Sequence, residues 1–140
     1  MRYVQIIIFL LLFSSCFDGD RGFEKEFYEK VTGIRFPRNY KILDTYDNGE
    51  FLTGTVFQFD STTMRNFIAQ NNFDTLRGAS FHFINVNLFD KEFQPQQTQR
   101  SVLFLIWKSK GKHNWTYLAD VSTNRLWTEI NYPDWADNKN

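Results

Sequence analysis

The chain has 140 residues, which is enough for one domain with its own hydrophobic core. Sixteen phenylalanines, six tyrosines and four tryptophans, with only seven glycines and three prolines, exclude a chain that is disordered throughout. Sixteen basic residues balance sixteen acidic ones, so the chain lacks the positive field typical of nucleic-acid-binding proteins. A single cysteine, Cys16, excludes an internal disulfide.

The first residues have the organisation of an export signal. Arg2 precedes the apolar run 6–13, and two serines separate that run from Cys16. At about 1.5 Å per residue, such a run spans only about half of a hydrocarbon core about 30 Å thick, so a transmembrane helix is the weaker interpretation. The pattern predicts a signal peptide over residues 1–15.

The last residues of this signal, Leu12-Phe13-Ser14-Ser15-Cys16, resemble the lipobox of bacterial lipoproteins. In that family a peptidase cuts before a cysteine that carries diacylglycerol. Phe13 departs from the family, which more often has leucine there. The resemblance implies a mature chain that begins at Cys16, is usually acylated on its amine by a fatty acid such as palmitate, and is anchored in the bacterial envelope, at the outer membrane. An ordinary secretory peptide with an incidental cysteine is the alternative.

Residues 16–22 are predicted to form the lipidated N-terminus and a tether, because "FDGDRG" has neither helical nor strand periodicity. Asp18 and Asp20 are similar to the acids that follow the lipidated cysteine in surface-exported lipoproteins of Bacteroidetes-type bacteria. The choice between the periplasmic and the outer face stays open.

Two amphipathic helices are predicted. Phe23, Phe27 and Val31 form an apolar stripe that indicates a helix over 22–32, with Gly33 as its left-handed C-cap.

A second helix is predicted over 62–71, where Met64 and Phe67 share one face after a run of capping residues. Residues 80–89 alternate in the manner of a strand, and residues 90–99 are predicted to form a loop.

Between the helices, two strand-like runs flank Asp47-Asn48-Gly49, which favours a tight hairpin turn. Pairing Tyr46 with Phe51 would place Tyr40 opposite Phe57. One face of this hairpin is then expected to be strongly aromatic.

Three apolar runs end the chain, at 101–107, 113–121 and 125–132, and their short connections favour an antiparallel meander. With the hairpin and helices they predict a single α+β domain over residues 23–135, in which two helices pack on an antiparallel meander sheet of five or six strands. Residues 136–140 are predicted to be a C-terminal tail.

Placing Lys108 opposite His113, and Val121 opposite Leu126, divides the meander side chains between two faces. The face expected to be the core consists of Val102, Phe104, Ile106, Trp115, Tyr117, Ala119, Val121, Leu126, Thr128, Ile130 and Tyr132. The opposite face also carries apolar residues, namely Leu103, Leu105, Trp107, Leu118 and Trp127.

This second apolar set has two interpretations. Strand 101–107 would be central and covered on both sides, by residues 73–93 or by a helix. If nothing covers the set, Trp107, Leu118 and Trp127 form a partner-binding patch.

Residues suited to catalysis or metal binding are sparse. His82 and His113 have no further ligand at a metal-binding spacing, no serine lies in a G-x-S-x-G motif, and the glycines form no phosphate-binding loop. No metal or cofactor is therefore expected. Asp120 and Glu129 share a face of the meander, with Asp134 nearby, and could supply the paired carboxylates of a glycoside hydrolase.

The lysines of "WKSKGKH", residues 107–113, are expected to solvate a hairpin tip rather than bind phosphates. The body resembles small Bacteroidetes-type lipoproteins that end in a "YLADVSTNRLWTEINYPDW"-like meander and have no established activity. The sequence therefore predicts a non-catalytic binding module on a lipid anchor, which contacts a protein or another envelope component and no nucleic acid. An immunity-type inhibitor of a toxin is a narrower version, and a small envelope hydrolase using Asp120 and Glu129 is the alternative.

Overall fold

The computed structural model describes residues 23–48, 51–76, 84–96, 98 and 101–132. The predicted signal peptide, Cys16, the tether, His82, Asp134 and the C-terminal tail lie outside these residues, and what was expected of them stays a prediction. The elements in chain order are α2 (Lys25–Thr32), β1 (Lys41–Asp47), β2 (Leu52–Gln58), α3 (Ser61–Gln70), β3 (Asp74–Thr75), a 3₁₀ helix (Val86–Leu88), β4 (Leu103–Lys110), β5 (His113–Asp120) and β6 (Arg125–Asn131).

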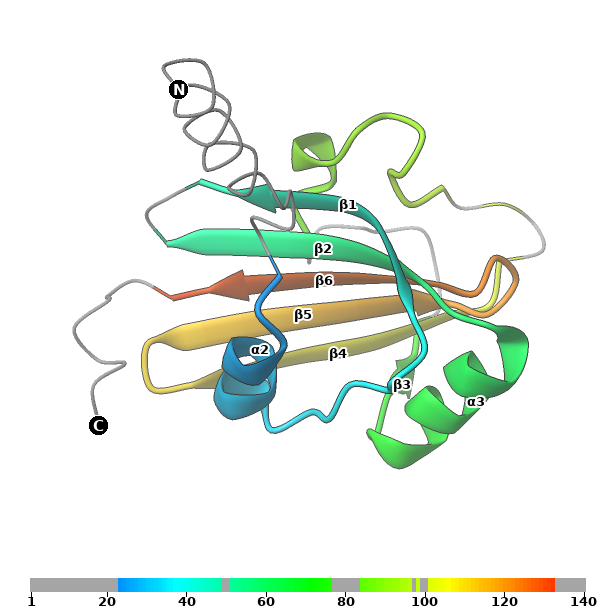
Figure 1. The fold of residues 1–140 in the computed structure, drawn as a ribbon, viewed down its shortest axis with the longest axis horizontal. Coiled ribbons are helices and arrows are strands. Elements are labelled where there is room, and N and C mark those ends of the chain that lie inside the picture. The colour runs from blue at the N-terminus through cyan, green and yellow to red at the C-terminus, as the bar shows by residue number, and fades with distance from the viewer. Residues whose placement is uncertain (1–22, 49–50, 77–83, 97, 99–100, 133–140) are drawn as a thin grey trace, which may run out of the picture.

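The strands form one six-stranded sheet in the order β1-β2-β6-β5-β4-β3, and every neighbouring pair is antiparallel. After β2 the chain leaves the sheet through α3 and returns at β3, on the edge opposite β1. The meander then runs back from β3 to β6, and β6 pairs with β2. Both helices lie on the same face of the sheet (Figure 1). The predicted α+β domain, with two helices and an antiparallel sheet of five or six strands, is confirmed.

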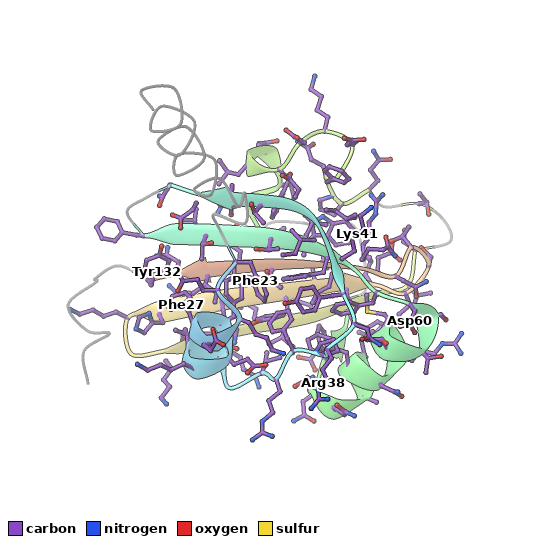
Figure 2. All side chains as sticks on the ribbon, viewed as in Figure 1. Phe23, Phe27, Arg38, Lys41, Asp60 and Tyr132 are labelled. Carbon is purple, nitrogen blue, oxygen red and sulfur yellow. The ribbon has the colours of Figure 1, made fainter. Side chains whose placement is uncertain are left out.

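The first helix ends as its sequence indicates. Gly33 has a φ of 71°, the left-handed conformation that glycine adopts without steric cost, and its N–H donates to the Glu29 carbonyl. The helix begins at Lys25 rather than at residue 22. Phe23 precedes the helix, and its ring lies 4.7 Å from that of Phe57 in the sheet. Phe27 lies within the helix, and its ring lies 5.2 Å from that of Tyr132 (Figure 2).

The second helix agrees with its prediction to within one residue at each end. The Asp60 carboxylate accepts a 2.9 Å hydrogen bond from the Thr63 N–H and so caps the first turn. Met64 and Phe67 are buried against the sheet, as the helical spacing requires.

The predicted register of the first hairpin is wrong. Tyr46 pairs with Gly54 rather than with Phe51, and a bulge between Ile42 and Asp44 reverses the alternation of side chains along β1. Residues before the bulge therefore pack on the helix face, where the rings of Tyr40 and Phe57 lie 5.4 Å apart. Tyr46 lies on the opposite face, so the expected single aromatic face does not form.

The predicted registers of the last two hairpins are each displaced by two residues. His113 pairs with Lys110 rather than Lys108, and Arg125 pairs with Asp120. Because side chains alternate with a period of two, a shift of two leaves each residue on its predicted face. Val102 is the exception: it precedes β4 and is 50% exposed.

The sheet carries a hydrophobic core on each face. The helix-side core combines α2 and α3 with the sheet and is rich in aromatic rings; its buried members are Phe23, Tyr28, Ile34, Phe36, Phe57, Phe59, Met64, Phe67, Ile106, Trp115, Tyr117, Ala119, Leu126, Ile130 and Tyr132. The second core lies under residues 84–93; its buried members are Val56, Ile84, Phe89, Leu103, Leu118 and Trp127.

Two further expectations are corrected. The strand predicted over 80–89 is absent from its described part, residues 84–89, which contains the 3₁₀ helix. Strand β4 is the second strand from the edge rather than a central one, because β3 pairs along its outer side. It is nevertheless apolar on both faces, because residues 84–93 cover the face that the helices leave open.

Candidate functional site

The predicted patch of Trp107, Leu118 and Trp127 does not form a surface. Leu118 and Trp127 are each only 2% exposed, and the indole N–H of Trp127 donates to the Phe93 carbonyl at 2.6 Å. Coverage of the second apolar set by residues from the 73–93 segment is thus confirmed for these two residues. Trp107 alone stays on the surface, 65% exposed.

Glu129 holds the covering segment on the sheet. Its Oε2 accepts hydrogen bonds from the Tyr46 hydroxyl at 2.6 Å and from the Asn85 N–H at 2.8 Å, and its Oε1 accepts from the Asn85 side-chain amide at 2.8 Å. Burial, together with the hydrogen bond to Glu129 and its charge, raises the pKa of Tyr46 far above its usual value. Glu129, one of the two candidate catalytic acids, therefore accepts three hydrogen bonds that serve the structure.

Asp120 stabilises the turn between β5 and β6. Its Oδ1 accepts from the Ser122 N–H at 2.8 Å and from the Ser122 hydroxyl at 2.6 Å, and its Oδ2 accepts from the Thr123 hydroxyl at 3.0 Å. This is the local bonding by which aspartate typically orders a turn.

The two candidate acids are not brought together. Asp120 lies opposite Arg125, and Glu129 is four residues further along β6. At about 3.3 Å per strand residue the two backbone positions are about 13 Å apart. The paired carboxyl groups of glycoside hydrolases are separated by about 5 to 9.5 Å. The shared face predicted for them is confirmed, but the spacing does not match a hydrolase pair.

Asp120 also contributes to a pocket of about 180 Å³ at the end of the second face. The pocket walls mix acidic, basic and amide groups, so no single charge dominates it. They are Glu92, Gln94, Gln96, Thr98, Ser101, Asp120, Thr123, Arg125 and Trp127.

The described residues offer no metal site, since no three His, Cys, Asp or Glu among them are grouped to hold an ion. His113 begins β5 opposite Lys110, and its Nδ1 is buried without a hydrogen-bond partner. In the same part of the chain, no helix is long and apolar enough to cross a membrane.

A larger depression lies between the last turn of α2 and the end of β4. We name it the α2–β4 groove; it is open to solvent and has a volume of about 530 Å³. Three of its nine lining residues are lysines and none is acidic. They are Lys30, Val31, Thr32, Gly33, Trp107, Lys108, Ser109, Lys110 and Trp115.

The fold explains how lysines distant in sequence meet here. Strand alternation directs Lys108 and Lys110 to the same side as Trp115, which faces α2. Lys30 reaches the groove from the last turn of α2. The Tyr117 hydroxyl donates to the Thr32 hydroxyl at 3.3 Å and holds the end of α2 against β5.

Sequence reasoning missed this groove. Lys108 and Lys110 were expected at a hairpin tip, but β4 extends through Lys110 and the turn consists of Gly111 and Lys112 alone. Gly111 has a φ of 61°, which suits a two-residue hairpin turn. The alternating lysines were the signal, but nothing in the sequence placed Lys30 beside them.

Comparisons of the chain with models of protein families, with curated proteins and with solved structures found no match.

Proposed function

We propose that the protein is an envelope lipoprotein, anchored through lipid on Cys16, whose folded domain is a non-catalytic binding module. The anchor rests on the lipobox-like sequence 12–16. Each buried methylene of an acyl chain contributes about 0.8 kcal/mol, so two or three chains would hold the protein at the membrane. The six residues 17–22 span at most about 20 Å, which would keep the domain close to the membrane surface.

The α2–β4 groove is the observation that carries the binding role. It gathers three lysines and two tryptophans in one concave surface without a lining carboxylate. Loss of Arg2 with the signal peptide would leave fifteen basic and sixteen acidic residues, a net charge of minus one (15 − 16). A cationic groove on a nearly neutral protein can select and orient a ligand of opposite charge.

The alternative, an envelope hydrolase using Asp120 and Glu129, has less support. Each of these carboxylates accepts three hydrogen bonds that hold a turn or the covering segment in place. Their separation along the sheet also leaves no position where one substrate bond could contact both.

The anchor is tested by replacing Cys16 with serine in the full-length protein. We expect loss of radiolabelled lipid incorporation and release of the protein from the membrane fraction. Ser14→Ala is the matched control and should keep both properties. Unchanged membrane retention of Cys16→Ser would refute the lipid anchor.

The binding role is tested by photo-crosslinking in native envelopes. A photoreactive amino acid at Lys30, in the groove, should capture a partner that the same group at Asn66, on the exposed side of α3, does not. Identical adducts from both positions would show only abundant neighbours and would contradict a binding role for the groove.

A further inference from the structure

We infer that the ligand of the α2–β4 groove is an extended, acidic segment of a partner protein. The inference rests on the proposed binding function and gives it a ligand class.

The spacing of the groove lysines favours an extended polypeptide. Lys108 and Lys110 are two residues apart on one strand and point to the same side, which separates their positions by about 6.7 Å. An extended peptide repeats its side chains on one side at the same interval. Acidic residues at alternate positions of such a peptide can therefore meet both ammonium groups at once, and Lys30 lies across the groove to neutralise a further carboxylate.

Trp115 provides a second, independent indication of a ligand. It lines the groove, is only 5% exposed, and its indole N–H is buried without a hydrogen-bond acceptor. Buried polar groups in folded proteins almost always have a partner. Because this N–H is buried, a shift of the indole would bring it to a carbonyl or carboxylate of a peptide bound in the groove, which would supply the missing acceptor.

Charge complementarity also selects against other occupants. A second copy of the groove would bring lysines against lysines, which disfavours dimerisation through this surface. A single phosphate or lipid headgroup carries its charge at one point and does not repeat at the spacing of Lys108 and Lys110. Asp18 and Asp20 are also acidic residues at alternate positions, as the proposed ligand requires. The protein's own tether is therefore a competitor for the groove, and the test includes it.

The test measures binding of a fluorescent peptide of about 12 residues, alternating glutamate and threonine, to the full protein in detergent. We expect saturable binding that weakens as ionic strength rises from about 0.05 to about 0.5 M. A peptide of the same composition with its glutamates contiguous, polygalacturonate, and anionic lipid vesicles should each bind more weakly. Equal or tighter binding of any of these three would overturn the inference.

Charge-reversal variants locate the site. Lys108→Glu combined with Lys110→Glu should weaken peptide binding by about tenfold or more, because two attractions become repulsions. Lys41→Glu with Lys91→Glu is the matched control, since both lysines are exposed and lie outside the groove lining, and Figure 2 shows Lys41 at the end of β1 away from α2. Equal loss in both pairs would mean nonspecific charge attraction and would contradict the inference.

Two comparisons keep the outcomes distinct. Thermal unfolding of each variant shows whether a loss of binding comes from loss of the fold, and the milder Lys108→Gln with Lys110→Gln replaces the reversal if it does. Tighter binding to Asp18→Asn with Asp20→Asn would identify the tether as a competing occupant and support the proposed ligand class. If the photoreactive group at Lys30 crosslinks a partner but no alternating peptide binds, the ligand class is wrong while the binding function stands; if neither occurs, both fail.

Discussion

The Tyr46 hydroxyl donates a 2.6 Å hydrogen bond to Oε2 of Glu129, joining two residues 83 positions apart in the chain. Glu129 also accepts two bonds from Asn85, so one carboxylate connects β1, β6 and the covering segment. These hydrogen bonds explain why Glu129 can lie beside the apolar core on the second face of the sheet. Both of its carboxylate oxygens accept hydrogen bonds, which offsets the cost of burying the carboxylate.

Replacing Tyr46 with phenylalanine removes one donor and leaves the rest of the ring in place. We expect a loss of about 1.5 to 3 kcal/mol in the free energy of unfolding, the usual range for a hydrogen bond to a charged group. Urea denaturation measures it. Tyr117→Phe is the matched control, because it removes only a 3.3 Å bond to the Thr32 hydroxyl and should cost less. An equal or smaller cost for Tyr46→Phe would contradict the assigned role of this bond.

Gly54 is required by the close approach of the Tyr46 ring across the β1–β2 pair. A Cβ at position 54 would lie 2.5 Å from Tyr46 Cε1, so one of the two residues must shift. We expect Gly54→Ala to lower stability by about 1 to 3 kcal/mol. The same substitution in a Tyr46→Ala background should cost much less, because the ring is gone. Denaturation of the four proteins of this cycle measures the coupling, and an equal cost in both backgrounds would rule out the contact as the cause.

The sheet face of each strand residue could be predicted from sequence more reliably than the residue that it pairs with on the neighbouring strand. The last two hairpins were displaced by two residues, yet Trp115 and Leu126 still fell on the helix side, since an even shift preserves alternation. The first hairpin failed at its turn, because Asp47 pairs with Thr53 and the pairing is already displaced by three residues there. The bulge after Ile42, which no local pattern marks, then changes the register by one and moves the earlier residues of β1 to the other face.

The groove and the hydrogen bonds of Glu129 both depend on contacts between distant segments of the chain, which local sequence patterns do not specify. Lys30 meets Lys108 only because α2 packs over the end of β4, and Asn85 meets Glu129 only because the covering segment crosses the sheet. Amphipathic spacing predicts which side of an element is buried, but it does not specify which distant segment buries it. Both sites therefore became visible only in the folded chain.

Tyrosine ionisation should couple to unfolding at alkaline pH. Burial raises the pKa of Tyr132 to about 12 and raises the pKa values of Tyr28, Tyr46 and Tyr117 above the ordinary value of about 10. Below pH about 10 these groups are protonated in both states and their contribution to stability is complete. As pH rises above about 10, the unfolded chain ionises first, so stability falls as pH increases toward and through the raised values.

Denaturant unfolding between pH about 8 and 12, with tyrosinate absorbance recorded in parallel, measures this coupling. We expect most of the absorbance change to coincide with loss of the near-ultraviolet circular dichroism signal. Complete ionisation near pH 10 in a protein that stays folded would contradict the burial of these hydroxyl groups.

The cap of α3 should make helix stability depend on acidic pH. Hydrogen bonds from the side chain and the backbone N–H of Thr63 lower the pKa of Asp60 below its usual value. A lowered pKa in the folded state gives a contribution that is present above the unfolded pKa of about 3.9 and is lost as pH falls through the folded value. We therefore expect Asp60→Asn, which keeps a capping acceptor, to fold at neutral pH but to lose less stability than the unaltered protein between pH about 4 and 2.

Asp60→Ala removes the acceptor altogether and should lower the melting temperature at neutral pH, where Asp60→Asn changes it less. Asp74→Asn, at an exposed position in β3, is the control for removing a carboxylate outside a cap. Melting curves of the three variants across this pH range separate the two effects. If Asp74→Asn changes the acid dependence as much as Asp60→Asn does, the effect reflects net charge, and the hydrogen bonds to Thr63 are not its cause.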